Sequence, residues 1–255
     1  MPLTRFFRCM MAPVTALALF AGPTATATAA AALPAVEPRA AEILTAALTH
    51  LAGMPSVRIR ADVVTETVLA SGQKLQYPGT LEIAMRRPDR LWYKLDSEQR
   101  RVVAWYDGKN FTLLDSEKNV CATTSAPAGL GPLFDDMAKR LRFRPPLSVL
   151  LREDSPAVVA KHMISGFYVG KGTIGGTECH HLSFEQQSVD LEFWIAAAGP
   201  PAIKRIVITQ KKRPAEPQLS YTIVSYEPDA AIDDTAFTFV PPPSVVRCEF
   251  ETLAR

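Results

Sequence analysis

The chain has 255 residues, and its 28 basic and 26 acidic side chains give a formal net charge of +2. This near balance excludes the basic surplus that a nucleic-acid-binding protein needs to neutralise phosphates. The length fits one domain with a substantial core.

Residues 1–32 have the features of a Sec-type signal peptide. Arg5 and Arg8 form a short positive segment, and residues 14–21 (VTALALFA) lie in an apolar stretch too short to span a bilayer. The run TATATAAAA then offers several cleavage points, of which we favour one near Ala32. Removing the two arginines leaves 26 basic and 26 acidic side chains. We therefore expect an exported protein with no membrane span and one domain, residues 33–255.

Two segments have the periodicity of amphipathic helices. In residues 37–51 the apolar side chains recur at steps of three and four, and Gly53 and Pro55 end the pattern. These apolar residues are Ala40, Ile43, Leu44, Ala47, Leu48 and Leu51. The second helix is predicted from about residue 131 to residue 142, by the same spacing of Leu130, Leu133, Phe134, Met137 and Leu141.

Most of the remaining chain alternates between apolar and polar residues, as strands with one wet face do. Asp107-Gly108 is a hairpin signal between two of these strands. We expect strands around residues 57–63, 81–85, 91–95, 102–106, 111–114, 163–169, 178–185, 189–195, 203–210 and 219–226. The pattern predicts a mainly β fold with helices (α+β). In it, the N-terminal helix and the mid-chain helical insertion cover the apolar face of a large curved antiparallel sheet.

Several motifs resemble known families of exported proteins. Residues 79–93 (GTLEIAMRRPDRLWY) with 106–111 (YDGKNF) resemble the first half of the periplasmic lipoprotein carriers LolA and LolB, and residues 234–242 (DTAFTFVPP) resemble the end of that fold. Residues 166–170, 179–184 and 189–195 resemble a bacterial family of predicted periplasmic proteins of unknown function, which is assigned to the same superfamily.

The resemblance implies a periplasmic half-barrel with a helical lid that binds lipid or lipoprotein acyl chains. The expected ligand-binding residues are apolar and face the space between sheet and lid. They are Leu81, Ile83, Met85, Leu91 and Tyr93 on the sheet, and Leu133, Phe134 and Met137 on the lid. No cofactor is implied.

Arg87 matches an arginine that holds the LolA lid closed. The alternation of its strand directs Arg87 to the apolar side, where a guanidinium needs hydrogen-bond acceptors. In the alternative arrangement Pro88 twists the strand and Arg87 reaches solvent.

The run Cys179-His180-His181 invites a metal or catalytic interpretation. On a regular strand His180 and His181 point to opposite faces, so they cannot bind one ion together. The sequence contains no G-x-S-x-G, S-x-x-K, P-loop or G-x-G-x-x-G motif. We therefore predict no metal site and no enzymatic activity. Any two of Cys121, Cys179 and Cys248 could form a disulfide after export, and their spacing does not choose a pair.

Trp92, Trp105 and Trp194 alternate with the aromatic residues of the apolar face, so they belong to the other face of the sheet. Either the chain itself covers them or they form an exposed patch for an envelope protein partner. A protein-interaction or sensing module with a filled core is therefore the alternative to lipid binding, and an unrecognised hydrolase or metal enzyme is the third possibility.

Overall fold

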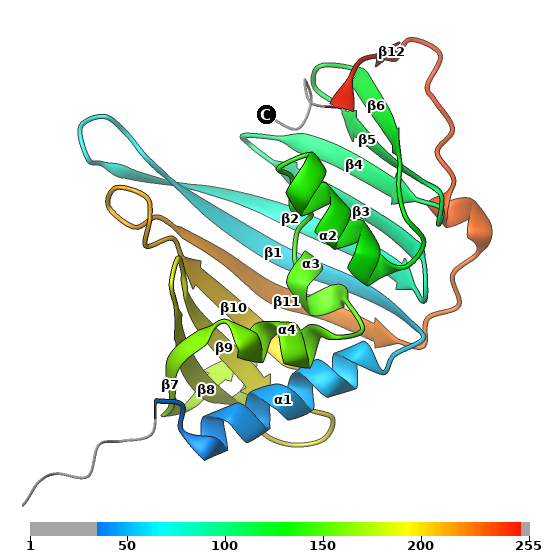
Figure 1. Cartoon of the computed structure of the whole chain (residues 1–255). Coiled ribbons are helices and arrows are strands. Elements are labelled where there is room, and N and C mark those ends of the chain that lie inside the picture. Colours follow the sequence, from blue (N-terminus) through cyan, green and yellow to red (C-terminus); the bar gives the residue numbers. More distant parts are fainter. Residues whose placement is uncertain (1–34, 251–255) are drawn as a thin grey trace, which may run out of the picture. The chain divides into compact units, whose positions relative to one another are not determined.

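A curved, largely antiparallel sheet dominates residues 35–250, the part of the chain that the computed structural model describes (Figure 1). The expected signal peptide lies outside these residues. The first meander consists of β1 (Ser56–Val68), β2 (Lys74–Arg86), β3 (Arg90–Ser97), β4 (Arg101–Tyr106), β5 (Asn110–Asp115) and β6 (Val120–Ser125). The second consists of β7 (Met163–Ile174), β8 (Thr177–Gln186), β9 (Asp190–Ala196), β10 (Ile203–Thr209) and β11 (Gln218–Pro228).

The two meanders join where β1 pairs with β11, which makes one twelve-stranded sheet within the described residues. A short last strand, β12 (Val246–Arg247), pairs with β6 in parallel. The strand order is therefore β12-β6-β5-β4-β3-β2-β1-β11-β10-β9-β8-β7. Because β6 and β7 lie near opposite ends of this order, the connection between them has to cross the sheet.

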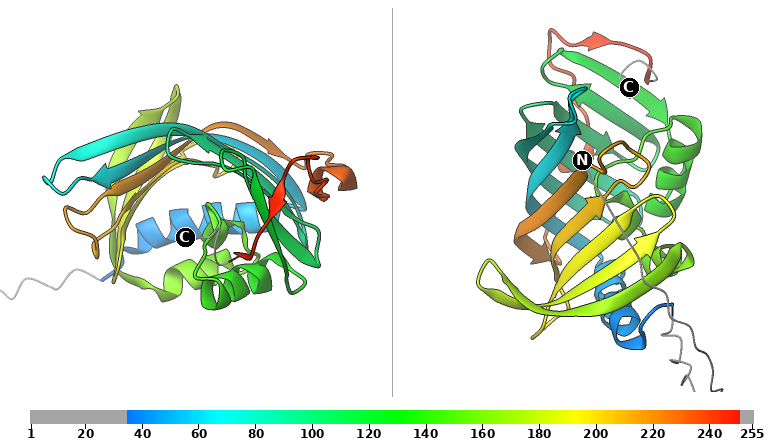
Figure 2. Two further views of the ribbon diagram at one scale, coloured as in Figure 1. Left: turned by 90° about the horizontal axis from the view of Figure 1, so that it is seen from above. Right: turned by 90° about the vertical axis from the view of Figure 1, so that its left-hand side faces the viewer.

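That connection crosses the concave face and contains three helices: α2 (Leu130–Arg140), α3 (Ser148–Leu151) and α4 (Ser155–Lys161). The N-terminal helix α1 (Pro38–Ala52) contacts α3, α4 and strands β7 to β9. Its buried residues are Ala40, Leu44, Ala47, Leu48 and Leu51. Figure 2 (left) shows the sheet as an arch with these helices beneath it. The predicted half-barrel covered by helices is confirmed, whereas β6, α3, α4 and β12 were not predicted.

The C-terminal segment partly covers the convex face. After β11 the chain forms a short 3₁₀ helix, η1 (Asp234–Phe237), and continues to β12. Ile232 and Phe237 pack against Trp92, and the Phe239 ring lies 4.9 Å from the Trp105 ring. The C-terminal segment of the chain itself therefore covers Trp92 and Trp105, which was the first of the two predicted alternatives. Trp194 stacks on His181 with ring centroids 4.1 Å apart.

The N-terminal residues of the described chain attach to the outer edge of β7. Gly166 donates its N–H to the carbonyl oxygen of Ala35, and Glu37 donates its N–H to the carbonyl oxygen of Gly166, both at 2.8 Å. A Cβ at Gly166 would lie 2.2 Å from the Phe184 ring, so this position requires glycine. Across residues 35–250, no helix is long and apolar enough to span a membrane.

Candidate functional site

The eight predicted ligand-binding residues meet between the sheet and the lid. On the sheet, Met85 pairs with Leu91 and Ile83 with Tyr93. All eight side chains are at most 5% exposed and belong to one hydrophobic cluster: Leu81, Ile83, Met85, Leu91, Tyr93, Leu133, Phe134 and Met137. They pack densely here, and their ligand-binding role stays a prediction.

Tyr93 places a polar atom in the centre of this cluster. Its side chain is 2% exposed, and its hydroxyl has no hydrogen-bond partner among the described residues. Burial raises the pKa of Tyr93 above its usual value, so the hydroxyl keeps its proton. A carbonyl oxygen of a bound molecule would satisfy this donor, which is otherwise costly to bury.

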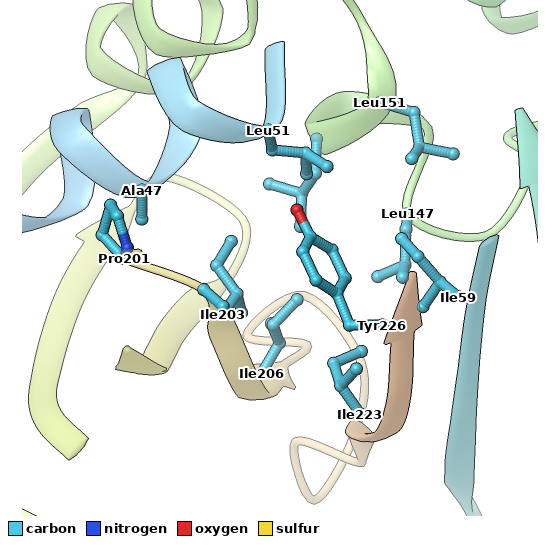
Figure 3. Close-up of a pocket in the computed structure, with 12 residues that line it drawn as sticks. Ala47, Leu51, Ile59, Leu147, Leu151, Pro201, Ile203, Ile206, Ile223 and Tyr226 are labelled. Carbon is cyan, nitrogen blue, oxygen red and sulfur yellow. The ribbon is translucent and has the colours of Figure 1, made fainter. Parts of the chain in front are cut away.

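An apolar cavity lies beside these residues, between α1, α3 and strands β1, β10 and β11 (Figure 3). It encloses about 20 Å³ that a water-sized sphere can enter. Among its lining residues, Tyr226 has the single polar side chain. The lining consists of Ala47, Leu51, Ile59, Leu147, Leu150, Leu151, Pro201, Ala202, Ile203, Ile206, Ile223 and Tyr226. In its present size the cavity has room for about one water molecule.

A larger groove of about 730 Å³ adjoins the cavity at the C-terminal end of α1. The two spaces share Ala202 and Tyr226 as wall residues. The hydroxyl of Tyr226 donates a hydrogen bond to Sδ of Met54 at 2.9 Å, and burial raises the pKa of Tyr226 to about 12. Tyr226 is therefore uncharged at neutral pH. Its contact with Met54 lies between the groove and the cavity.

Arg87 follows β2 and links α1 to the lid segment, which is the connection between β6 and β7 (residues 126–162). Its Nε donates to the carbonyl oxygen of Met54 at 3.0 Å, and Nη2 donates to that of Leu51 at 3.4 Å. Its Nη1 lies 3.0 Å from Oε1 of Glu153, in the connection between α3 and α4. The side chain is 12% exposed, so it does not extend into solvent. These contacts tie Arg87 to the last turn of α1 and to the residues that follow it.

A second arginine holds the lid segment together. Arg152, which follows α3, forms an ion pair with Asp135 of α2 at 2.8 Å and another with Asp154, the residue before α4. Hydrogen bonding to Arg152 lowers the pKa of Asp135, which therefore stays ionised. The sequence did not single out Arg152, because its partner Asp135 lies on a separate helix, 17 residues earlier in the chain.

The two adjacent histidines lie on opposite faces of β8, as their positions predicted. His180 Nδ1 is 3.2 Å from the Tyr168 hydroxyl, whereas His181 Nε2 is 2.9 Å from Oε2 of Glu192 and its ring stacks on Trp194. Within residues 35–250, no three His, Cys, Asp or Glu side chains come together in a group that could hold a metal ion.

The cysteines Cys121, Cys179 and Cys248 are free thiols in the described chain. Cys179 is on β8, far along the strand order from β6, which carries Cys121. Cys248 lies beside β6, where its N–H donates to the carbonyl oxygen of Cys121 at 2.9 Å. Of the three conceivable pairs, only Cys121 with Cys248 has adjacent backbones.

The sequence did not identify the cavity lining as a group. Ala47 and Leu51 were visible as part of the apolar helix face, and Ile203 and Ile206 lie in a predicted strand. What brings them together is the pairing of β1 with β11, which joins residues more than 150 positions apart in the chain. No local periodicity carries that information.

Several solved structures are similar to this chain. An uncharacterised conserved protein from Thermus thermophilus is 10% identical over 83% of this chain and 99% of its own, with a TM-score of 0.47. MucB, in its complex with MucA from Pseudomonas aeruginosa, is 13% identical over 79% of this chain and 61% of its own (TM-score 0.42). Lipoprotein LppX from Mycobacterium tuberculosis is 11% identical over 77% of this chain and 100% of its own (TM-score 0.43). With TM-scores below 0.5, these similarities support no conclusion about function.

Among curated proteins, no sequence matches significantly. The family model of predicted periplasmic proteins, DUF2092, matches residues 40–251 and so spans most of the chain. It agrees with the motifs around residues 166–195 and with the predicted location outside the cytoplasm. The chain belongs to the DUF2092 family of predicted periplasmic proteins.

Proposed function

We propose that this periplasmic protein binds a lipid, a lipoprotein acyl chain or another apolar ligand between its curved sheet and its helices, without catalysing a reaction. The observation that supports this most directly is the apolar cavity between α1, α3 and the concave face of the sheet. A buried space lined by aliphatic side chains favours an alkyl chain, since each buried CH₂ contributes about 0.8 kcal/mol.

Binding requires the helices to move, because the cavity of about 20 Å³ is far too small for an acyl chain. The lid segment and α1 would separate from the sheet, and the eight core residues predicted from the sequence would become the surface that the chain contacts. Arg87 would resist this motion through its bonds to α1 and its ion pair with Glu153. In this proposal Arg87 is the lid latch.

Two neighbouring alanines on α1 test the site. Ala47 is 1% exposed and lines the cavity, whereas Ala46 is exposed on the same helix. We expect Ala47→Leu to fill the space and to weaken binding of a fluorescent dodecanoate derivative about tenfold or more, because overpacking costs about 1–3 kcal/mol. Ala46→Leu should bind like the natural protein.

Fluorescence titration measures the affinity, and circular dichroism checks that each variant is folded. Equal affinity of all three proteins would move the binding site away from the cavity. Absence of binding in all three would indicate a permanently filled core and would contradict the proposal.

A second candidate function, the docking of an extended peptide, is favoured by the outer edge of β7. This edge already accepts backbone pairing from Ala35 and Glu37 at Gly166. Farther along, Phe167 and Val169 are 55% and 47% exposed. A partner strand could extend this pairing, as in β-augmentation. A photo-crosslinking side chain at position 167, compared with one at the exposed Val240, would then capture a partner peptide in the periplasm at position 167 alone.

A further inference from the structure

The groove beside the cavity has a composition that differs from that of the cavity. It is built from the end of α1, the start of β8, the connection between β9 and β10, and the end of β11. Its lining residues are Thr49, His50, Gly53, Met54, Pro55, Thr177, Ala196, Ala198, Pro200, Ala202, Lys204, Tyr226, Pro228 and Asp229. The groove thus combines small apolar walls with several polar side chains, unlike the aliphatic cavity.

The groove and the cavity lie on either side of two shared wall residues. Ala202 and Tyr226 line both spaces, and Met54 contacts the Tyr226 hydroxyl from the groove side. The carbonyl oxygen of Met54 accepts a hydrogen bond from Arg87 at 3.0 Å. Met54, which contacts Tyr226 where the two spaces meet, is therefore held by the proposed lid latch. Releasing Arg87 would free Met54 and open the passage along Tyr226.

Hydrogen-bond donors predominate among the polar side chains of the groove. Thr49, Thr177, His50 and Lys204 can all donate, whereas Asp229 supplies the one carboxylate and is exposed at the rim. Lys204 lies at an irregularity in the pairing of β10 with β9. It is partly buried, and within residues 35–250 it forms no ion pair. A partly buried ammonium group without a counter-charge favours a ligand that brings an anionic oxygen.

We infer that this groove binds the anionic oxygen headgroup, a carboxylate or a phosphate, of an amphiphile whose single acyl chain passes Ala202 and Tyr226 into the cavity. The inference rests on the proposed function, because it assumes that the cavity opens for an acyl chain. It adds the headgroup class and assigns its charge recognition to Lys204. One chain fits better than two, because the groove and the cavity share walls at only two residues.

The test compares amphiphiles of equal chain length: dodecanoate, dodecyl phosphate and the uncharged dodecanol. Their affinities are measured by calorimetry for the natural protein, Lys204→Gln, Lys204→Arg and Lys212→Gln. Lys212 is an exposed lysine in the turn after β10 and serves as the matched control. We expect Lys204→Gln to weaken binding of at least one anionic amphiphile about tenfold, because a hydrogen bond to a charged group is lost. Lys204→Arg should restore most of this affinity, and dodecanol binding should not change.

The outcomes separate the inference from the proposed function. A Lys204-dependent loss for dodecanoate alone would identify a carboxylate headgroup, and a loss for dodecyl phosphate alone a phosphate. If all three amphiphiles bind and Lys204→Gln weakens none of them, the headgroup site is wrong while acyl binding stands. If dodecanol binding falls as much as dodecanoate binding, Lys204 has a structural role and the inference fails. If none of the amphiphiles binds, the proposed function fails together with the inference.

Discussion

Arg87 contacts two of the elements that a ligand would have to separate from the sheet. Its guanidinium binds two carbonyl oxygens near the end of α1 and lies 3.0 Å from Glu153 in the lid segment. The guanidinium is positively charged, so its hydrogen bonds are charge-assisted. Because it is largely buried, water weakens these bonds little. It is therefore the residue at which lid stability and ligand exchange should be coupled.

Arg87→Leu should loosen both contacts. We expect the free energy of unfolding to fall by about 1.5–3 kcal/mol, the usual contribution of a hydrogen bond from a charged group. We also expect faster amide hydrogen exchange in peptides that cover residues 49–55 and 147–155. Arg86→Leu is the matched control, because Arg86 contacts Ile232 and Asp234 of the C-terminal segment instead. Unchanged exchange in both peptides, or unchanged ligand exchange rates, would show that Arg87 is not a latch.

His180 should make stability depend on pH. Burial, and then the charges of Arg39 and Lys171, hold its pKa below the ordinary value of 6.5, while Glu178 opposes them. The unfolded chain therefore takes up the proton first as the pH falls. Stability contributed by neutral His180 is present above about pH 6.5 and is lost as the pH falls from there towards the lowered folded-state pKa.

Urea unfolding at about pH 7.5 and about pH 5.5 measures this effect. We expect the natural protein to lose more stability between these two pH values than His180→Gln does. His162→Gln is a suitable control, because that exposed histidine follows α4 on the lid. An equal loss in the natural protein and in His180→Gln would contradict the assignment.

The C-terminal segment covers the part of the convex face around Trp92 and Trp105. Phe237 is 1% exposed and packs with Trp92, although it lies in a four-residue 3₁₀ helix outside the sheet. Its ring also faces the guanidinium of Arg86 at 5.5 Å. Because so short a helix is not stable by itself, the packing of Phe237 adds to the segment's local hydrogen bonds in holding it on the sheet.

Phe237→Ala should release this segment. We expect a loss of about 3 kcal/mol in the free energy of unfolding and a red shift in tryptophan emission, because Trp92 becomes more exposed. Val240→Ala, at a side chain that is 78% exposed, should change neither quantity. Urea unfolding monitored by tryptophan fluorescence gives both readouts. An unshifted emission spectrum would mean that the segment does not shield Trp92.

Most of the periodic elements could be predicted from the sequence, whereas β6, α3, α4 and β12 could not. Helix α1 was predicted from apolar residues at steps of three and four, and strands such as β3 from the alternation of apolar and polar residues. Helix α4 has seven residues, and β12 consists of Val246 and Arg247 paired to β6. Their existence depends on neighbours far along the chain. The orientation of Arg87 was equally undecidable from the sequence, because Pro88 interrupts the alternation.

The strand order of the described chain explains why helices cover the sheet. The first meander ends with β6 and the second begins with β7, near opposite ends of one curved sheet, so residues 126–162 have to cross the concave face. This connection carries the apolar side chains that the open face requires. The predicted ligand residues follow from this arrangement, whereas the cavity and the groove depend on how β10 and β11 meet α1.

Binding of an acyl chain between the sheet and the helices can be decided by native mass spectrometry of the mature protein purified from the periplasm, with organic extraction of the same sample. We predict one bound amphiphile for each protein, with a single acyl chain and an acidic headgroup. A protein that is empty after purification, and that takes up no added acyl amphiphile, would contradict the claim and would leave peptide docking at β7 as the remaining candidate.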